Sequence, residues 1–259
     1  MAEFLTDFFG VRDKVAVLTG AGGHLVSEMA RGLAAAGIKV ALLDRDLNAV
    51  EDVVDGICSD GGDAIAIEVD VTNKQDLEDA LDTIIKKYSR LDYAVFGANL
   101  NASTPFLDIP EDEWNAIINV QLTGTMLGLQ VFGGYMVEQG KGAIVTISSA
   151  SADPPLSKAF TYSVAKAGVR NLTQNVAREW ATKGVRVNAL RPGFFPTEWS
   201  KVHFIDEERN AAILGHTAMG RYGEPKELVG AVLWLLSDAA TFVTGAEIAV
   251  DGGFSAMTI

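Results

Sequence analysis

The sequence is poor in the side chains that build metal sites and covalent cross-links. It holds one cysteine, Cys58, and three histidines, which are His24, His203 and His216. A single cysteine cannot form an intramolecular disulfide, and the histidines show no ligand spacing with one another or with the cysteine. The sequence therefore predicts neither a disulfide nor a metal site. Cys58 falls in the helical stretch 47–61, where we expect a small packing residue and not a nucleophile.

Basic side chains and long apolar runs are also scarce. The 21 Lys and Arg residues are outnumbered by 34 Asp and Glu residues, so the formal net charge is −13. This balance argues against binding to nucleic acid or to an anionic membrane surface and favours small-molecule partners. No apolar run reaches the roughly 18 residues of a membrane span, and the amino-terminal MAEFLTDFFGVRDK lacks the pattern of a signal peptide. We expect a cytoplasmic protein.

Nothing in the sequence marks a domain boundary. There is no Pro/Ser/Gly-rich linker, no block of like charge and no low-complexity segment. Short apolar runs alternate instead with helical patterns along the whole chain. The strand-like runs are residues 15–19, 39–44, 64–70, 93–98, 143–149, 185–192 and 247–253. The helical patterns are residues 25–36, 47–60, 73–88, 160–182 and 225–237, with a further long one from residue 111.

This repeated strand–helix–strand order predicts the fold class. Strands that are apolar on both faces are typical of a parallel sheet covered by helices. We therefore expect an α/β protein with one Rossmann-type domain over residues 1–259, built on a doubly wound, seven-stranded parallel sheet with helices on both faces. In such a fold ligands bind beyond the carboxyl ends of the strands.

Residues 192–224 form the longest stretch without a clear pattern, and we expect a substrate loop or lid there. Its basic and imidazole side chains could meet a substrate carboxylate. These are Lys201, His203, Arg209 and His216. Its aromatic side chains could equally line a pocket for an apolar alcohol or anchor the lid. These are Phe194, Phe195, Trp199 and Phe204.

The stretch TGAGGHLV, residues 19–26, has the composition of a nucleotide loop. Gly20, Gly22 and Gly23 allow backbone N–H groups to approach a phosphate, next to the positive end of the following helix. Asp44 ends the second strand, where a carboxylate accepts hydrogen bonds from ribose hydroxyls and repels a 2′-phosphate. The sequence therefore predicts NAD as cofactor. Arg45 could contact a 2′-phosphate instead, which keeps NADP as the alternative.

The stretch TYSVAK carries the catalytic hypothesis. Tyr162 and Lys166 are four residues apart in a helical pattern, so their side chains share one face. An ammonium beside a phenol lowers the phenol pKa from about 10 toward the working pH of a general acid/base. Ser149, at the end of a strand, could hydrogen-bond the same substrate oxygen.

Taken together, these motifs resemble the short-chain dehydrogenase/reductase family over essentially the whole chain. The matching pieces are TGAGG, Asp44, VDV around Asp70, Gly97-Ala98, ISS ending in Ser149, YSVAK, RPGFFPT and DGG. The carboxyl third is most similar to the D-mannonate (fructuronate) oxidoreductase branch, followed by gluconate 5-dehydrogenase-like enzymes. The resemblance implies a homotetramer with the helices near residues 111–138 and 160–182 at the interface.

The resemblance also implies residue roles. Tyr162 would be the acid/base, Ser149 the donor to the substrate oxygen, and Lys166 the residue that lowers the tyrosine pKa and holds the nicotinamide ribose. Asp70 would meet the adenine, and Thr197 the phosphate or amide side of the cofactor. Further cofactor contacts are expected at His24, Leu25, Val71, Ala98, Asn99, Pro192, Gly193 and Phe195.

Three departures from the family pattern stand in this chain. The later loop glycines are His24 and Val26, the first Asn of the NNAG motif is Phe96, and the active-site Asn is Gln121. We expect Gly22 and Gly23 to make the tight turn and Val26 to pack the helix on its strand. Gln121 keeps an amide that could hold a proton-relay water.

The predicted function is hydride transfer between NAD and a secondary alcohol or ketone, with a sugar acid or polyol as substrate. Two alternatives remain open from the sequence. One is a dehydrogenase of apolar cyclic or aromatic alcohols, and the other is a nucleotide-binding scaffold with impaired catalysis.

Overall fold

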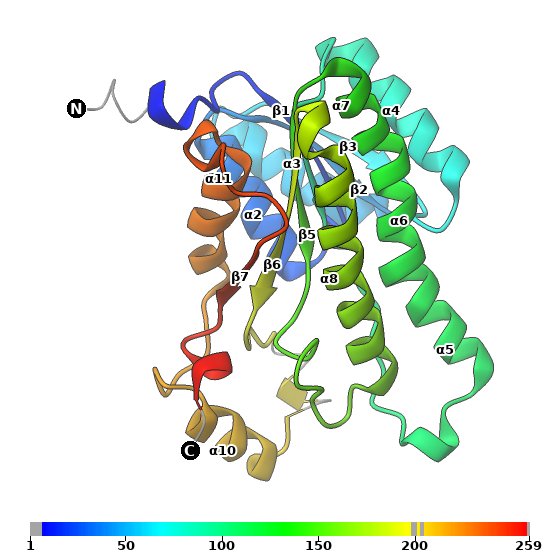
Figure 1. Ribbon diagram of the computed structural model, residues 1–259, viewed down its shortest axis with the longest axis vertical. Helices are drawn as coiled ribbons and strands as arrows, with labels where there is room; N and C mark the ends of the chain where they lie inside the picture. The colour runs from blue at the N-terminus through cyan, green and yellow to red at the C-terminus, as the bar shows by residue number, and fades with distance from the viewer. Residues whose placement is uncertain (1–6, 198–200, 203–204, 258–259) are drawn as a thin grey trace.

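The structure is a computed structural model that describes residues 7–197, 201–202 and 205–257. The predicted lid residues Trp199, His203 and Phe204 lie outside these ranges. Seven parallel strands form one sheet in the order β3-β2-β1-β4-β5-β6-β7 (Figure 1). They are β1 (Val15–Thr19), β2 (Lys39–Asp44), β3 (Ala64–Glu68), β4 (Tyr93–Phe96), β5 (Gly142–Ile147), β6 (Val185–Pro192) and β7 (Glu247–Val250).

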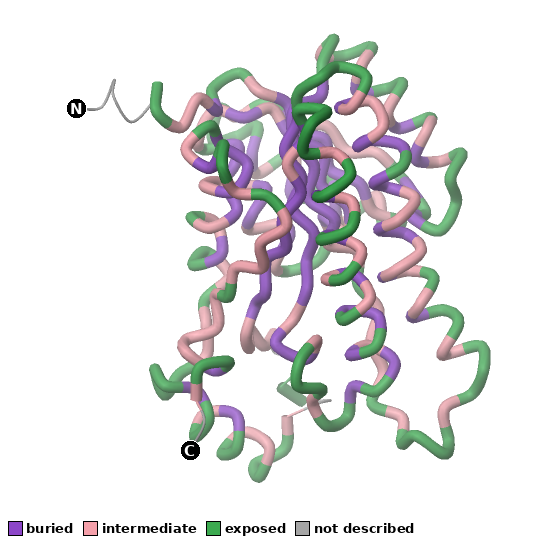
Figure 2. The backbone as a smooth tube through the Cα atoms, viewed as in Figure 1, coloured by how far each residue is buried: buried purple, intermediate pink, exposed green. Residues whose placement is uncertain are grey.

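The apolar strands bury both of their faces. All five residues of β1 are buried, and they alternate between two hydrophobic clusters: Val15 and Val17 belong to one, Ala16 and Leu18 to the other. Successive side chains of a strand point to opposite faces, so a continuous apolar run requires cover on both sides. Figure 2 shows this buried layer running along the central strands.

Helices cover the two faces of the sheet. One layer holds α2 (His24–Ala35), α3 (Leu47–Ser59) and α11 (Val229–Leu236). The other holds α4 (Lys74–Tyr88), α8 (Phe160–Trp180) and the helical run α5 (Glu111–Ile118), α6 (Gly124–Gly128) and α7 (Gly134–Gln139). The predicted fold class, a doubly wound seven-stranded parallel sheet with helices on both faces, is confirmed.

The run Glu111–Gln139 is one long helix with two π-helical turns, Asn119–Thr123 and Leu129–Gly133. By length and composition alone it is long and apolar enough to cross a membrane, with a mean hydropathy of 1.2 over a stretch of 18 residues. Half of that stretch is buried inside the protein. Burial against the sheet accounts for its apolar character, as in the core helices of many α/β proteins.

Two local predictions were wrong. The 192–224 stretch is not without pattern, because it contains the helix α10 (Glu207–His216), whose start is capped by the side chain of Asp206. Cys58 is exposed and does not pack. The core face of α3 is made by Val50, Val53 and Ile57, and the next residue along a helix is turned by about 100° from its neighbour.

Candidate functional site

The glycine loop and the end of β4 meet where β1 lies between β2 and β4, the point at which the strand order reverses. Gly20 follows β1 with φ +72°, and a Cβ on it would lie 2.6 Å from Cα of Ala98. The Gly97 N–H donates to the carbonyl oxygen of Thr19 at 3.2 Å. Position 20 therefore requires glycine both for its backbone conformation and for this close approach. Such a crevice is where open α/β sheets bind ligands.

The second half of the loop leaves the helix start open. The Gly23 N–H donates to the Gly20 carbonyl at 3.0 Å, and Gly23 is the N-cap of α2 without a side-chain cap. Gly23 and His24 are both exposed, and Leu25 is half-buried against the core. Uncapped N–H groups at a helix N-terminus form a ready site for an anion, so the loop fits a dinucleotide pyrophosphate.

Val26 points away from the loop opening. It is buried, and its Cγ2 lies 2.5 Å from where a Cβ on Gly97 would stand. The valine that replaces a family glycine therefore packs α2 onto the end of β4, as expected.

Asp44 connects the second strand to the loop. Its Oδ2 accepts a hydrogen bond from the Gly22 N–H at 3.1 Å, and its Oδ1 accepts one from the Asp46 N–H at 3.2 Å. The carboxylate and the glycines, predicted separately to bind a cofactor, are thus in direct contact. Because the side chain is half-buried beside the loop, its charge is well placed to act on a ribose bound there.

Arg45 and Asp70 lie in acidic surroundings at the edge of the sheet. They line a cavity of about 500 Å³ together with Glu68, Asp76 and Asp79. Asp70 Oδ1 accepts hydrogen bonds from the N–H and Oγ1 of Thr72, at 2.8 and 2.7 Å. Any phosphate placed at Arg45 would face several carboxylates.

The residues around the end of β4 fall into two groups. Phe96 is buried and stacks on Phe132, with ring centroids 6.3 Å apart, so it belongs to the core and does not close the crevice. Val71 is also buried, whereas Ala98 is half-buried and Asn99 exposed. Of the predicted cofactor contacts here, Ala98 and Asn99 are the accessible ones.

The structure brings the predicted catalytic residues together. Ser149 follows β5, and a side-chain hydrogen bond links it to Tyr162 in the first turn of α8. Lys166, one turn further on, has its Nζ 5.5 Å from the centre of the Tyr162 ring. That Nζ donates to the carbonyl oxygen of Ile147 at 2.9 Å.

The electrostatics of this group differ from the sequence expectation. Burial raises the pKa of Tyr162, and the hydrogen bond with Ser149 opposes that rise. Burial lowers the pKa of Lys166 to about 7. Burial and Ser149 are the causes acting on the tyrosine pKa, and desolvation weakens the charge by which Lys166 would favour the phenolate. Tyr162 is protonated at neutral pH, the state in which a phenol can donate.

Gln121 lies in the first π turn, a local widening of the helix that often marks a functional position. It is 1% exposed, and its Nε2 donates to the carbonyl oxygen of Leu100 at 2.5 Å. Its Oε1 is buried with no partner among the described residues. The side chain does not hydrogen-bond Tyr162 or Lys166 directly. Buried acceptors without a hydrogen-bond partner are rare in proteins, so Gln121 Oε1 is a suitable site for a donor such as a water.

The segment after β6 is held by close packing. Pro192 is buried, and a Cβ on Gly193 would lie 2.6 Å from Cα of Asp251. Phe195 packs on Gly223, and the ring of Phe194 lies 5.1 Å from that of Phe254. The two aromatic residues both anchor the segment and line a cavity of about 370 Å³.

The remaining lid residues lie further along. Thr197 is half-buried and Lys201 exposed. Arg209 donates to Ser157 Oγ at 2.8 Å, which ties α10 to the segment before α8. His216 is exposed and stacks edge-on against Phe254, with ring centroids 4.8 Å apart. Of the described lid cations, Arg209 and His216 lie on α10 and Lys201 lies before it, and the charges of Lys201 and Arg209 both act on Tyr222.

Two charged residues beside Ser149 were missed from the sequence. Arg191 lies near the end of β6 and Glu247 is the first residue of β7, and they form an ion pair at 3.2 Å. A charge within a strand of the sheet was the signal that could have found them, because such a side chain needs a specific partner.

Comparison with known proteins places the chain in a family. The sequence model for the family described as Enoyl-(Acyl carrier protein) reductase matches residues 25–255. The uncharacterized oxidoreductase UxuB of Bacillus subtilis (strain 168) is 36% identical, over 94% of this chain and 95% of that protein. The chain belongs to the short-chain dehydrogenase/reductase family, and it is an oxidoreductase of that family.

Two solved structures share the fold over nearly their whole length. One is described as a putative NAD(P) dependent gluconate 5-dehydrogenase from Beutenbergia cavernae with bound NADP, with TM-score 0.90, 33% identity and coverage of 96% of this chain and 99% of that one. The other is a putative D-mannonate oxidoreductase from Haemophilus influenza with bound NAD, with TM-score 0.89, 32% identity and coverage of 95% and 96%. The predicted similarity to this branch is confirmed.

Proposed function

We propose that the protein transfers a hydride between NAD and a secondary alcohol or ketone of a sugar acid or polyol. The observation that carries the proposal is the Ser149–Tyr162 hydrogen bond with Lys166 beside the tyrosine ring. The glycine loop that fits a pyrophosphate lies at the same carboxyl edge of the sheet.

Each residue has a distinct task in this reaction. The nicotinamide cofactor supplies the hydride or accepts it. Tyr162 gives a proton to the carbonyl oxygen in reduction and takes the hydroxyl proton in oxidation. Ser149 donates a hydrogen bond that orients the same substrate oxygen. Lys166, held at the Ile147 carbonyl, would hold the cofactor ribose, and Gln121 would hold a water for proton relay.

The preference for NAD over NADP rests on charge. Asp44 already contacts the glycine loop through Gly22, so a 2′-phosphate on the adenosine ribose would meet its carboxylate. Arg45 cannot offset that repulsion alone, since Glu68 and Asp70 line the same cavity. One solved relative carries NAD and the other carries NADP, so the relatives do not favour either cofactor. The proposed preference for NAD therefore rests on the residues of this chain alone.

The substrate class is supported by the relatives named for gluconate and mannonate and by the lid. Residues 192–224 form the lid in this proposal, and Arg209 is its half-buried cation. Burial lowers the pKa of Arg209 without removing its charge. A guanidinium in that position suits a substrate carboxylate.

A second candidate is a dehydrogenase of apolar cyclic or aromatic alcohols. It is favoured by the cavity of about 370 Å³ next to Phe194 and Phe195. Relative kcat/KM on gluconate-type sugar acids and on cyclic or aromatic alcohols separates the two candidates.

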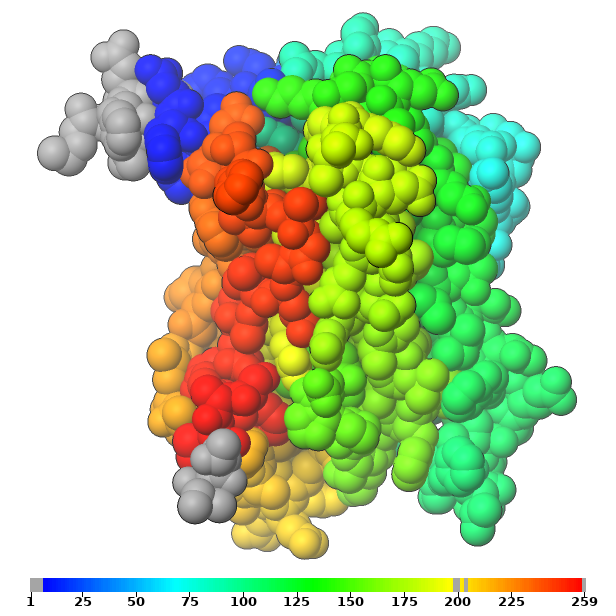
Figure 3. All heavy atoms as spheres, in the orientation of Figure 1, coloured from blue at the N-terminus to red at the C-terminus, as the bar shows by residue number. Residues whose placement is uncertain are grey.

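The proposed assembly is a cytoplasmic homotetramer that pairs α8 and the 111–139 helix with their copies. These helices lie side by side on one face of the molecule (Figure 3). Two apolar residues of α8, Phe160 and Val164, are about half exposed, at 47% and 50%. Exposed apolar side chains on one face are typical of subunit contacts. Light scattering of the purified protein measures the size.

The deciding experiment replaces Tyr162 by Phe. We expect NADH binding, followed by nicotinamide fluorescence, to stay within about twofold of wild type, while kcat on a sugar-acid substrate falls by about 100-fold or more. Tyr88→Phe is the matched control, because it removes a tyrosine hydroxyl that hydrogen-bonds Asp63 on the surface. Equal turnover in wild type and Tyr162→Phe would refute the assignment. Absence of turnover in wild type with NADH bound would favour the scaffold alternative.

A further inference from the structure

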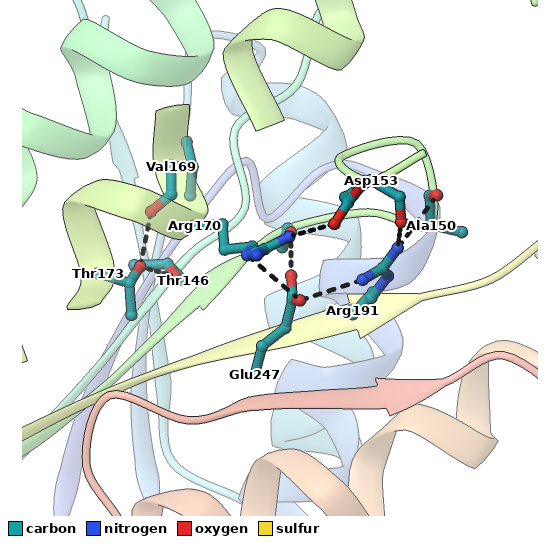
Figure 4. Close-up of polar contacts among 9 residues, drawn as sticks. Thr146, Ala150, Asp153, Val169, Arg170, Thr173, Arg191 and Glu247 are labelled. Carbon is teal, nitrogen blue, oxygen red and sulfur yellow. Dashed lines mark hydrogen bonds and ion pairs between the residues drawn. The ribbon is translucent and has the colours of Figure 1, made fainter. Parts of the chain in front are cut away.

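Glu247, at the start of the last strand, lies against the segment that carries Ser149. Its Oε1 accepts a hydrogen bond from Ser148 Oγ at 2.7 Å, and its Oε2 accepts one from Arg191 Nη1 at 3.2 Å (Figure 4 shows the contacts with the arginines). The Glu247 side chain is 15% exposed. A carboxylate this buried depends on its partners, and here one partner is the residue directly before Ser149.

Arg191 contacts the backbone that follows Ser149 in the sequence. Its Nη2 donates to the backbone carbonyls of Ala150, at 3.5 Å, and of Asp153. The Ala150 N–H in turn donates to the carbonyl of Pro192 at 3.0 Å. Ser149 is half-buried between two buried residues, each of which is fixed to the β6–β7 edge of the sheet. The backbone of Ser149 is therefore held to that edge, and its Oγ accepts hydrogen bonds from the N–H and the Oγ of Ser151, each at 3.1 Å.

Arg170 extends the same cluster to the catalytic helix. Its Nε lies 3.8 Å from Glu247 Oε2, and its Nη1 donates to Asp153 Oδ2 at 3.2 Å (Figure 4). Arg170 follows Tyr162 and Lys166 at steps of four residues, so the three side chains share one face of α8. Glu247 thus contacts both the Ser149 segment and the helix that presents Tyr162.

We propose that Glu247 is a positioning residue, which sets the placement of Ser149 relative to Tyr162 through Ser148, Arg191 and Arg170. The inference rests on the catalytic roles proposed above. It has a physical basis in the steep dependence of reaction rate on the placement of reacting groups. Ser149 stands in a segment beyond its strand, and such segments are less constrained than strands unless side chains tie them down.

The test compares Glu247→Gln with Asp92→Asn. Asp92 is a matched control because it is also buried and pairs with an arginine, Arg90, and with the Val15 N–H, at the opposite end of the strands. Both substitutions neutralise a buried carboxylate, so we expect both proteins to lose stability. Only Glu247→Gln should lower kcat, by about 10- to 100-fold, with the affinity for NADH unchanged.

A second readout separates positioning from general loosening of the structure. The polar groups at Tyr162 are Ser149 and Lys166, and the hydrogen bond with Ser149 acts to lower the tyrosine pKa. Displacing Ser149 therefore shifts the ionisation of Tyr162 to higher pH. We expect the pH profile of kcat/KM to move up in Glu247→Gln and to stay in place in Asp92→Asn. Tyrosinate absorbance, taken as the difference from the matching Tyr162→Phe protein, records the same shift without turnover.

The outcomes distinguish this inference from the proposed function. If wild type lacks turnover, or Tyr162→Phe keeps it, the proposed function fails, and the tyrosinate titration still tests the placement of Ser149. If the proposed function holds but Glu247→Gln matches Asp92→Asn in kcat and in pH profile, the positioning role is overturned. Should Glu247→Gln not fold, Arg191→Lys keeps the charge but loses the paired donation to Ala150 and Asp153, and it must show the same two shifts.

Discussion

At the scale of single residues, Asp44 has one contact with the glycine loop and one proposed task. Its carboxylate accepts a hydrogen bond from the loop at Gly22, and in the proposed NAD site its negative charge would repel a 2′-phosphate on the ribose. An asparagine amide in the same place can still accept the hydrogen bond from Gly22, but it carries no charge to repel a 2′-phosphate. The preference between NAD and NADP can therefore be changed without disrupting the glycine loop.

We expect Asp44→Asn to narrow the preference for NADH over NADPH by about tenfold, because the repulsion of the 2′-phosphate is lost. Fluorescence titration with both nucleotides measures the ratio. Asp46→Asn is the control: it lies two residues further on, caps α3 through the Ala49 N–H, and does not contact the glycine loop. An unchanged ratio in Asp44→Asn would remove the basis for the NAD proposal.

At the scale of elements, two contacts tie α10 to the segment before α8. Lys158 Nζ lies 2.7 Å from Asp206 Oδ2, and Arg209 donates to Ser157 Oγ at 2.8 Å. The hydrogen bond with Lys158 lowers the pKa of Asp206. A carboxyl whose pKa is lowered stays ionised, and keeps its ion pair, at every pH above its ordinary pKa. The ion pair is lost only as the pH falls through the lowered pKa. The contact is therefore intact at neutral pH.

We expect Asp206→Asn to raise the substrate KM a few-fold with little change in kcat, because the proposed lid would then be held by one ion pair fewer. The asparagine retains an acceptor for the Arg209 N–H at the start of α10. Steady-state kinetics at low and high salt measure the effect, which should shrink as salt screens the wild-type pair. Glu207→Gln, on the same helix, is the control. Equal KM values in both variants would show that this ion pair has no part in closure.

Most elements were predictable because their patterns are local. The β1 run, the pairing of α2 with the glycine loop and the i, i+4 spacing of Tyr162 and Lys166 can all be recognised from residues close in sequence. The Glu247–Ser148 contact joins residues 99 positions apart, and only the β6–β7 pairing brings them together. The tyrosine pKa was predicted in the wrong direction, since burial is a tertiary property that spacing does not reveal.

At the scale of the whole molecule, the buried Lys166, which is proposed to act in catalysis, lowers the free energy of unfolding. Lys166 is 3% exposed and its pKa is about 7, against 10.5 for the ordinary side chain. Between these two pH values the unfolded chain binds a proton that the folded protein does not. The free energy of unfolding therefore rises as the pH increases from 7 toward 10.5. At and below pH 7, Lys166 lowers the free energy of unfolding by its full amount.

We expect Lys166→Met to abolish turnover and to raise the free energy of unfolding at pH 7 by about 1–3 kcal/mol, because a buried charge is no longer required. The gain should shrink as the pH approaches 10, where the lysine is neutral in both states. Urea unfolding at pH 7 and pH 9.5 measures it, with Lys86→Met, an exposed lysine of α4, as the control. A loss of stability in Lys166→Met would contradict this account.

The position of Glu247 on the last strand has a consequence for protein synthesis. The glycine loop and the strands on either side of it are complete once the first hundred residues have been made. The contact that fixes Ser148, by contrast, requires β7, which is synthesised after the other six strands of the sheet. A partly synthesised chain can thus hold the elements of the proposed nucleotide site while the Ser149 segment is still unsecured, and we expect activity only once β7 has joined the sheet.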